Sequence, residues 1–137
     1  MHAVALSAIL NTVRVFKNKW FYRWAKNENI PDSVLHNAAI QIISGNVEAD
    51  LGGHLFKKRI ARSGGGKRGG YRTIVGYRKP NTERIIFLYA FAKNASADIS
   101  DKEEAALSIA AEAFVLATDE EIKKLLTNGS IWEVHHE

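Results

Sequence analysis

Lysine and arginine are the side chains in this sequence whose number and spacing best suit chemistry. The stretch from His54 to Lys93 carries eleven Lys or Arg and one acid, Glu83, a local balance of +10. Cations that alternate with β-forming residues cannot all be buried, because an unpaired buried charge is too costly. They must therefore form a basic surface on a sheet. Such a surface suits a polyanion, and nucleic acid is the first candidate.

Some of these cations stand at defined places on predicted strands. Lys57 and Arg59 are two residues apart and so share one face of a strand, Arg72 opens the next strand, and Lys93 ends the last one. The alternative is a surface that only keeps the protein in solution or binds a partner. Concentrated cations repel one another and raise the free energy of the folded state unless an anion binds, which favours a nucleic-acid surface.

The glycine-rich segment from Ser63 to Gly70 resembles a dinucleotide-binding loop in its spacing, but that loop needs a helix after it, and here a strand follows. We expect instead a basic lid over nucleic acid with Lys67 and Arg68 at its tip; a solvated loop is the alternative. His54 is a weaker candidate for a catalytic base, since a lone His is more often structural. The chain has no Cys, which excludes thiolate chemistry and disulfides.

The chain has 137 residues, 46% of them hydrophobic and 25% charged, as expected for one domain with one core. We expect residues 1–12 to be an N-terminal extension and residues 13–137 to form that domain. No stretch is long enough to cross a bilayer, and the short apolar run at 3–10 has no basic leader, so we expect a cytoplasmic protein. Residues 94–137 hold three basic and ten acidic groups, which we expect on solvated helix faces.

The elements that must position the cations can be predicted from periodicity. Phe16, Trp20 and Trp24 recur at four-residue steps, which predicts a helix whose aromatic face is far more typical of a core than of a base-stacking surface. A second helix from Pro31 to Ser44 completes an αα-hairpin over a sheet. Strands are expected over residues 13–16, 55–62, 71–78 and 84–92, the last of them central, with a turn at 50–53.

The acidic C-terminal part carries two capping boxes. Ser100 with Glu103, and Thr118 with Glu121, each place a hydroxyl three residues before a carboxylate, which predicts the start of a helix. A short strand over 131–134 is expected to extend the edge of the sheet. The sequence therefore predicts an α+β protein.

The order strand–helix–helix–strand–strand–strand–helix resembles the RelE/ParE toxin superfamily, in particular its HigB-like branch of RelE-type toxins from bacterial type II toxin–antitoxin systems. The resemblance covers about residues 13–134. It implies a RelE-like fold, with a small, mostly antiparallel, curved sheet, an N-terminal αα-hairpin packed on it and additional C-terminal helices. The segments that carry it are 16–21, Asp50-Leu51-Gly52-Gly53, 57–62, Gly66-Lys67, Gly69-Gly70-Tyr71-Arg72 and 91–94.

The resemblance implies a ribosome-dependent, metal-independent endoribonuclease that cuts mRNA and needs no cofactor. It implies catalytic roles for the cations on the second strand, at the start of the third and just after the fourth, which are here Lys57, Arg59, Arg72 and Lys93. Many relatives place a Tyr, a His or a further Arg after the last strand, whereas Asn94 to Ala97 supply none. The remaining cations are expected to bind RNA: Lys58, Arg62, Lys67, Arg68 and Arg78.

The resemblance also implies partners. These are mRNA on the ribosome and a cognate antitoxin, expected to be a helix-turn-helix protein that binds the basic face, with oligomers formed only through that antitoxin. Cations suit this chemistry because attack by the RNA 2′-OH concentrates negative charge on phosphoryl oxygens. Crowding by other cations disfavours the charged form of a Lys, so Lys57 or Lys93 could carry a proton, with Arg72 as a phosphate clamp. A ParE-like gyrase inhibitor and a non-catalytic nucleic-acid-binding module are the alternatives.

Overall fold

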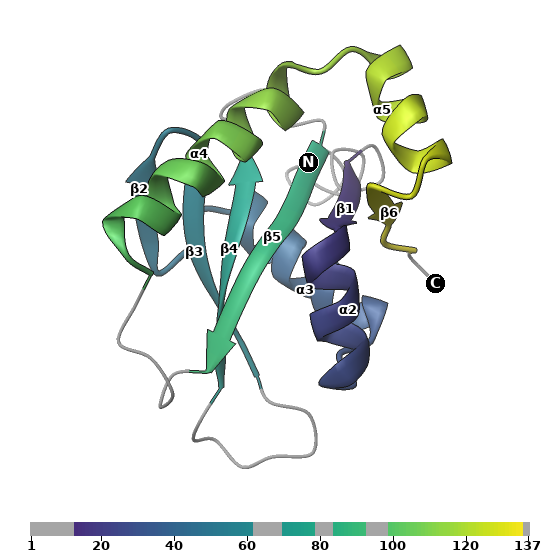
Figure 1. Cartoon of the computed structure of the whole chain (residues 1–137). Helices are drawn as coiled ribbons and strands as arrows, with labels where there is room; N and C mark the ends of the chain where they lie inside the picture. The colour runs from purple at the N-terminus through teal and green to yellow at the C-terminus, as the bar shows by residue number, and fades with distance from the viewer. Residues whose placement is uncertain (1–12, 62–69, 79–83, 93–98, 136–137) are drawn as a thin grey trace, which may run out of the picture.

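The computed structural model of the chain describes residues 13–61, 70–78, 84–92 and 99–135, which form an α+β fold (Figure 1). Two pairs of helices flank a run of four strands, with one further strand at each end of the described order. In chain order they are β1 (Arg14–Asn18), α2 (Lys19–Asn27), α3 (Asp32–Ile43), β2 (Ala49–Gly52), β3 (Leu55–Ile60), β4 (Tyr71–Tyr77), β5 (Arg84–Ala92), α4 (Asp101–Leu116), α5 (Asp119–Thr127) and β6 (Ile131–Glu133). The predicted αα-hairpin and C-terminal helices are confirmed.

The strands form one sheet in the order β2-β3-β4-β5-β1-β6. Neighbouring strands are antiparallel except β1 and β5, which run parallel with Val15 beside Ile85. The apolar run of β5 predicted a central strand, and β5 does lie inside the sheet between β4 and β1. Its side chains at Ile85 and Phe87 are fully buried. The predicted sheet, mostly antiparallel, is confirmed by these strand pairings.

Helices cover both faces of this sheet, with α4 in front of it and α3 behind it in Figure 1. On the face covered by α2 and α3, Phe21 and Leu35 belong to a core that includes Val75 and Phe87 of the strands. On the other face Ala111 and the remaining buried side chains of α4 and α5 belong to a second core. Because both faces carry helices, successive residues of the central strands are buried, which explains their nearly continuous apolar sequence.

The first helix begins later than its aromatic spacing predicts. Phe16 lies in β1, and α2 starts only after Asn18, whose side-chain oxygen accepts a hydrogen bond from the backbone N–H of Phe21 at 2.8 Å. The buried residues of α2 are then Phe21 and Ala25, while Trp20 is 42% exposed. The prediction that these aromatic residues form a core face of one helix is wrong. Phe16 belongs to the strand, which continues to Asn18, and the helix that begins there buries Phe21 and Ala25 instead of Trp20.

The two capping boxes are confirmed. The hydroxyl oxygens of Ser100 and Thr118 accept hydrogen bonds from the backbone N–H groups of Glu103 and Glu121, both at 3.1 Å, and each Glu carboxylate accepts from the backbone N–H of its cap. Local signals of this kind fix where α4 and α5 begin.

Within the described ranges, no helix combines the length and apolar character that crossing a bilayer would require.

Two short strands complete the edges of the sheet. The segment at 50–53, predicted to be only a turn, belongs in part to β2, which pairs with β3. The turn itself is confined to Gly52, Gly53 and His54, which adopt positive φ angles. At the opposite edge β6 pairs antiparallel with β1, as predicted.

Candidate nucleic-acid interface

Three of the predicted catalytic cations lie side by side on β3 and β4. Arg59 pairs directly with Arg72, and Lys57 pairs with Ile74. Side chains alternate between the faces of a strand, so Lys57 and Arg59 point to the same face as Leu55, and Arg72 to the same face as Ile74. Leu55 and Ile74 belong to the core under α4. The three cations therefore share the face of the sheet that carries α4.

α4 covers only one end of that face. In Figure 1 the helix crosses the strands near one end, and β3, β4 and β5 continue well beyond it. The crossing lies over Gly76, where an added Cβ would be 3.0 Å from the Cβ of Ala111. Arg72 lies four residues earlier on β4, toward the other end of the strand. The cations thus begin where the helix stops covering the sheet.

Arg72 brings a buried donor to this face of the sheet. The residue is half-buried, and its Nη1 atom is buried with no hydrogen-bond partner among the residues that the structure describes. A buried donor left without a partner costs free energy comparable to a lost hydrogen bond. A phosphate would satisfy it, because the planar guanidinium matches two phosphate oxygens at once.

The start of β4 is held from the opposite face. Tyr71, next to Arg72, is buried; its hydroxyl donates to the carboxylate of Glu28 at 2.5 Å, and its ring packs edge-on against Trp24 at 4.9 Å. Gly70 permits the close approach of the strands, since a Cβ there would lie 2.8 Å from the carbonyl oxygen of Ile60. These contacts fix the backbone that presents Arg72.

The β3 strand is held in a similar way. The carboxylate of Glu48 accepts a hydrogen bond from the backbone N–H of Arg59 at 2.5 Å, and the Glu48 N–H donates to the carbonyl of Lys57 at 2.9 Å. Lys57 is half-buried and Arg59 is exposed. The cations therefore stand on a rigid backbone, the condition that charge stabilisation in a transition state requires.

Aromatic side chains continue this face across β5 to α2. Tyr89 pairs with Ile74, and Phe91 pairs with Arg72, so both stand beside the cations on the same face. Trp20 of α2 lies against Tyr89 with a ring-centre distance of 4.5 Å. The interface thus consists of neighbouring cations and aromatic rings, a combination typical of surfaces that bind single-stranded nucleic acid.

A comparison with protein families gives this face its context. The model described as the RelE toxin of the RelE/RelB toxin–antitoxin system matches residues 13–134. The chain belongs to this family. It is therefore a toxin of a toxin–antitoxin system, and membership implies a cognate antitoxin as its partner. The comparison with curated proteins finds no match.

The fold of the toxin agrees with this family, as the resemblance predicted, but the expected RNA-binding residues do not all gather at one place. Lys58 is only 3% exposed and points to the face covered by α2 and α3. Arg78 follows the opposite end of β4 from Arg72. His54 lies near that same far end, where its carbonyl accepts a hydrogen bond from the Tyr77 N–H at 3.1 Å. None of these three is part of the cluster formed by Lys57, Arg59 and Arg72.

Four predicted residues of the toxin lie outside the described residues: Arg62, Lys67, Arg68 and Lys93. The same is true of the predicted lid and of the N-terminal extension at 1–12. Among the residues that the structure does describe, no three His, Asp or Glu side chains gather where a metal ion could be held.

Sequence reasoning missed the aromatic part of the interface. Tyr89 and Phe91 belong to an apolar run that reads as core throughout, and Trp20 was assigned to a core stripe. One signal could have found Trp20: Asn18 is a favoured helix N-cap, and a helix starting after it places Phe21 and Ala25, four residues apart, on the buried face.

Proposed function

We propose that this toxin is a ribosome-dependent, metal-independent endoribonuclease that cuts mRNA and so inhibits translation. The observation that carries the proposal is the cluster of Lys57, Arg59 and Arg72, with the buried Nη1 of Arg72 left without a partner among the described residues. We also propose that it belongs to the HigB-like branch and acts in the cytoplasm, where its ribosomal substrate is found.

The proposed reaction is an internal transfer at phosphorus. The RNA 2′-oxygen bonds to the adjacent phosphorus, the bond from phosphorus to the 5′-oxygen breaks, and the products are a 2′,3′-cyclic phosphate and a 5′-hydroxyl. Arg72 holds two phosphoryl oxygens, and Arg59 adds charge beside it. A preorganised cation stabilises the charge that develops on these oxygens more than it stabilises the ground state.

Two protons must move in this reaction. One leaves the 2′-hydroxyl, and one reaches the 5′-oxygen as it departs. We assign the first transfer to Lys57, because it stands two residues from Arg59 on the cluster face, and Lys93 is the second candidate for a proton carrier. Water protonates the departing 5′-oxygen, and the hydroxide that remains takes the proton that Lys57 has collected, so that both are regenerated.

The antitoxin is proposed to bind the same basic face. A helix-turn-helix antitoxin with an acidic or strand-forming segment would cover the cations, and charge complementarity would steer the two proteins together. The toxin would then form oligomers only through its antitoxin. Co-purification of the toxin with the product of the neighbouring gene tests this, and two proteins that coexist without binding would contradict it.

The nuclease proposal is tested with purified full-length toxin, treated with EDTA and dialysed before use, and ribosomes programmed with a defined mRNA in a buffer that keeps the Mg²⁺ the ribosomes need. We expect new 5′ ends within the reading frame and a 2′,3′-cyclic phosphate on the upstream fragment. The same mRNA without ribosomes should stay largely intact. Intact mRNA on the ribosome, with inhibited gyrase supercoiling instead, would overturn the proposal in favour of a ParE-like activity.

A further inference from the structure

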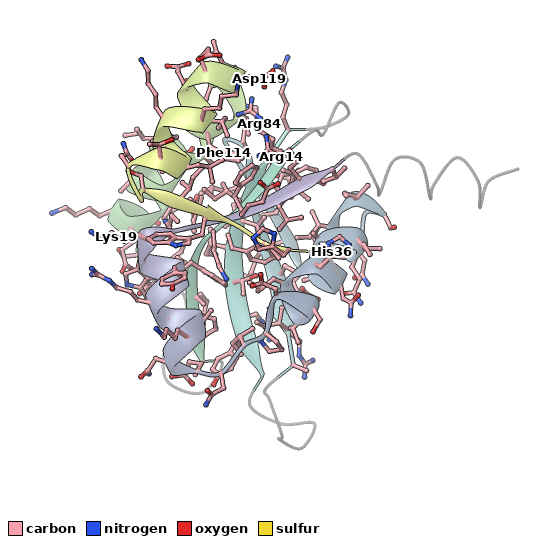
Figure 2. All side chains as sticks on the ribbon, turned by 90° about the vertical axis from the view of Figure 1, so that its right-hand side faces the viewer. Arg14, Lys19, His36, Arg84, Phe114 and Asp119 are labelled. Atoms are coloured by element: carbon pink, nitrogen blue, oxygen red, sulfur yellow. The ribbon has the colours of Figure 1, made fainter. Side chains whose placement is uncertain are left out.

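Trp20 is exposed in a way that the cation cluster does not explain. Its side chain is 42% exposed, the only large aromatic among the described residues that is so accessible. It lines a surface hollow of about 540 Å³ together with Lys19, Arg23 and Trp24. Figure 2 shows Lys19 pointing to the side of the molecule on which α4 lies, which is the side that carries the cations. A hollow lined by two indole rings and two cations has the composition of surfaces that stack on nucleobases.

The ring of Trp20 is held in a fixed orientation. It lies nearly parallel to Trp24, with an interplanar angle of 10° and a centroid distance of 6.3 Å, and it contacts Tyr89 at 4.5 Å. Trp24 is in turn packed against the buried Tyr71. A ring supported on two sides loses little conformational entropy when a ligand covers its remaining surface.

This ring is continuous with the proposed catalytic face. Tyr89 and Phe91 are 6.4 Å apart between ring centres, and Phe91 pairs with Arg72 across β4 and β5. The aromatic row therefore leads from α2 to the strand position beside the phosphate clamp. A ligand with alternating flat rings and negative charges would match this row, with its rings over Trp20 and its anions near Lys19 and Arg23.

We propose that Trp20, supported by Tyr89 and flanked by Lys19 and Arg23, is a stacking site for one unpaired nucleobase of the RNA that the cation cluster binds. The proposal rests on the proposed function, in that RNA is taken to be the substrate. Stacking does not depend on which base is present, because every base has a π-face. The site therefore positions the strand beside Arg72 and adds little preference for sequence.

The first test separates stacking from bulk with full-length variants at Trp20. The measurement is single-turnover cleavage on programmed ribosomes over a range of toxin concentrations. We expect Trp20→Phe to stay within a few-fold of the parent, whereas Trp20→Leu and Trp20→Ala raise the half-saturating concentration about ten- to a hundredfold. The rate at saturation should stay within about twofold. Leu116→Ala, at an exposed apolar position on α4, is the matched control and should change neither value.

The second test identifies the ligand as a base. Abasic nucleotides are placed one at a time around the cleavage site of the mRNA. One position should weaken parent binding as much as Trp20→Ala does and should have no further effect in that variant, since both changes remove the same contact. If Trp20→Leu binds like the parent, or if every abasic position adds fully to Trp20→Ala, the stacking site is wrong.

A third measurement keeps failure of this proposal distinct from failure of the nuclease proposal. It uses anisotropy of a fluorescein-labelled single-stranded RNA with the toxin in the absence of ribosomes. RNA binding that depends on Trp20, without cleavage, would overturn only the nuclease. Cleavage that is independent of Trp20, with antitoxin binding lost in Trp20→Ala, would assign the ring to the protein partner and overturn the stacking site. Absence of both RNA binding and cleavage would overturn both proposals. All variants are first checked for parent-like thermal unfolding.

Discussion

One face of the sheet is divided into two unlike halves, and both are built from the same strands. At one end Leu55, Ile74 and Gly76 lie under α4 and are fully or almost fully buried. At the other end Arg59 and Arg72 occupy positions with the same orientation, two or four residues along. The alternation of a strand decides which face a side chain joins. The reach of the covering helix then decides whether that side chain is core or interface.

The covered half is shaped by small residues, and the open half by charge. Gly76 lets Ala111 approach the sheet so closely that a Cβ at residue 76 would lie 3.0 Å from the Ala111 Cβ. On the open half the strands carry Arg59, which is exposed, and Arg72, which is half-buried, where the covered half carries apolar side chains. Substitutions that add volume on the covered half should therefore lower stability. Substitutions that remove a charge on the open half should lower activity.

The largest expected effect is on the open half. Arg72→Ala should lower the single-turnover cleavage rate about a hundredfold or more, the usual scale for losing one oriented charge stabiliser. Arg72→Lys should recover only part of this rate, because an ammonium cannot hold two phosphate oxygens in the fork geometry of a guanidinium. The measurement uses programmed ribosomes with toxin in excess, so that binding is saturated.

Lys102→Ala, which removes an exposed cation from the first turn of α4, is the control for net charge and should cleave at the parent rate. Parent-rate cleavage by saturated Arg72→Ala would show that the chemistry lies elsewhere on the molecule. The unfolding free energy of Arg72→Ala should not fall, since the substitution removes a buried nitrogen that has no partner among the described residues.

A smaller effect is expected on the covered half. Gly76→Val should lower the free energy of unfolding by about 1–3 kcal/mol, because added carbon beneath a packed helix forces backbone shifts. Besides Ala111, the new atoms would meet the Cγ2 of Ile86, 3.3 Å from a Cβ at this position. Urea unfolding followed by circular dichroism measures the change, and Gly76→Ala should lie between Val and the parent.

Cleavage by the folded fraction of Gly76→Val should stay close to the parent, since the cations are on the uncovered part of the strands. A large loss of activity per folded molecule would mean that α4 and the cluster are coupled. Unfolding at the parent urea concentration would instead mean that α4 does not pack over residue 76.

The sequence predicts the parts of this fold that depend on local signals. The capping boxes at Ser100 and Thr118 were found because neighbouring residues alone determine them. The charge density between His54 and Lys93 predicted a basic face. The alternation of β3 also separates Lys57 from Lys58 by face, although the sequence alone could not tell which of the two faces the helices leave open.

What the sequence could not show depends on contacts between distant segments. The exposure of Trp20 follows from β1 continuing to Asn18, which is stabilised by pairing with β6 more than a hundred residues later. Tyr89 and Phe91 have the composition of a core strand, and only the limited reach of α4 leaves them beside the cations. The position of a helix over a sheet is a long-range property, and it is this property that separates core from interface here.

The smallest expected effect concerns the ion pair that joins the edge strand β6 to its neighbour β1. Arg14 donates two hydrogen bonds to the carboxylate of Glu133, at 2.7 and 2.8 Å, and so ties β1 to β6, the strand that follows α5. This hydrogen bonding lowers the pKa of Glu133 below its ordinary value of 4.5, against the opposing effect of burial. The pair contributes stability at pH values above that ordinary pKa, and the contribution is lost as the pH falls through the lowered pKa of the folded state.

Because both side chains are roughly a third to a half exposed, solvent screens the pair, and Glu133→Gln should cost only about 0.5 kcal/mol at pH 7. Urea unfolding of parent and variant at pH 7 and at pH values below 4 should show the difference shrinking toward acid. A difference that persists unchanged in acid would mean that Glu133 acts through packing, and any change in cleavage rate would mean that the covered side reaches the cations after all.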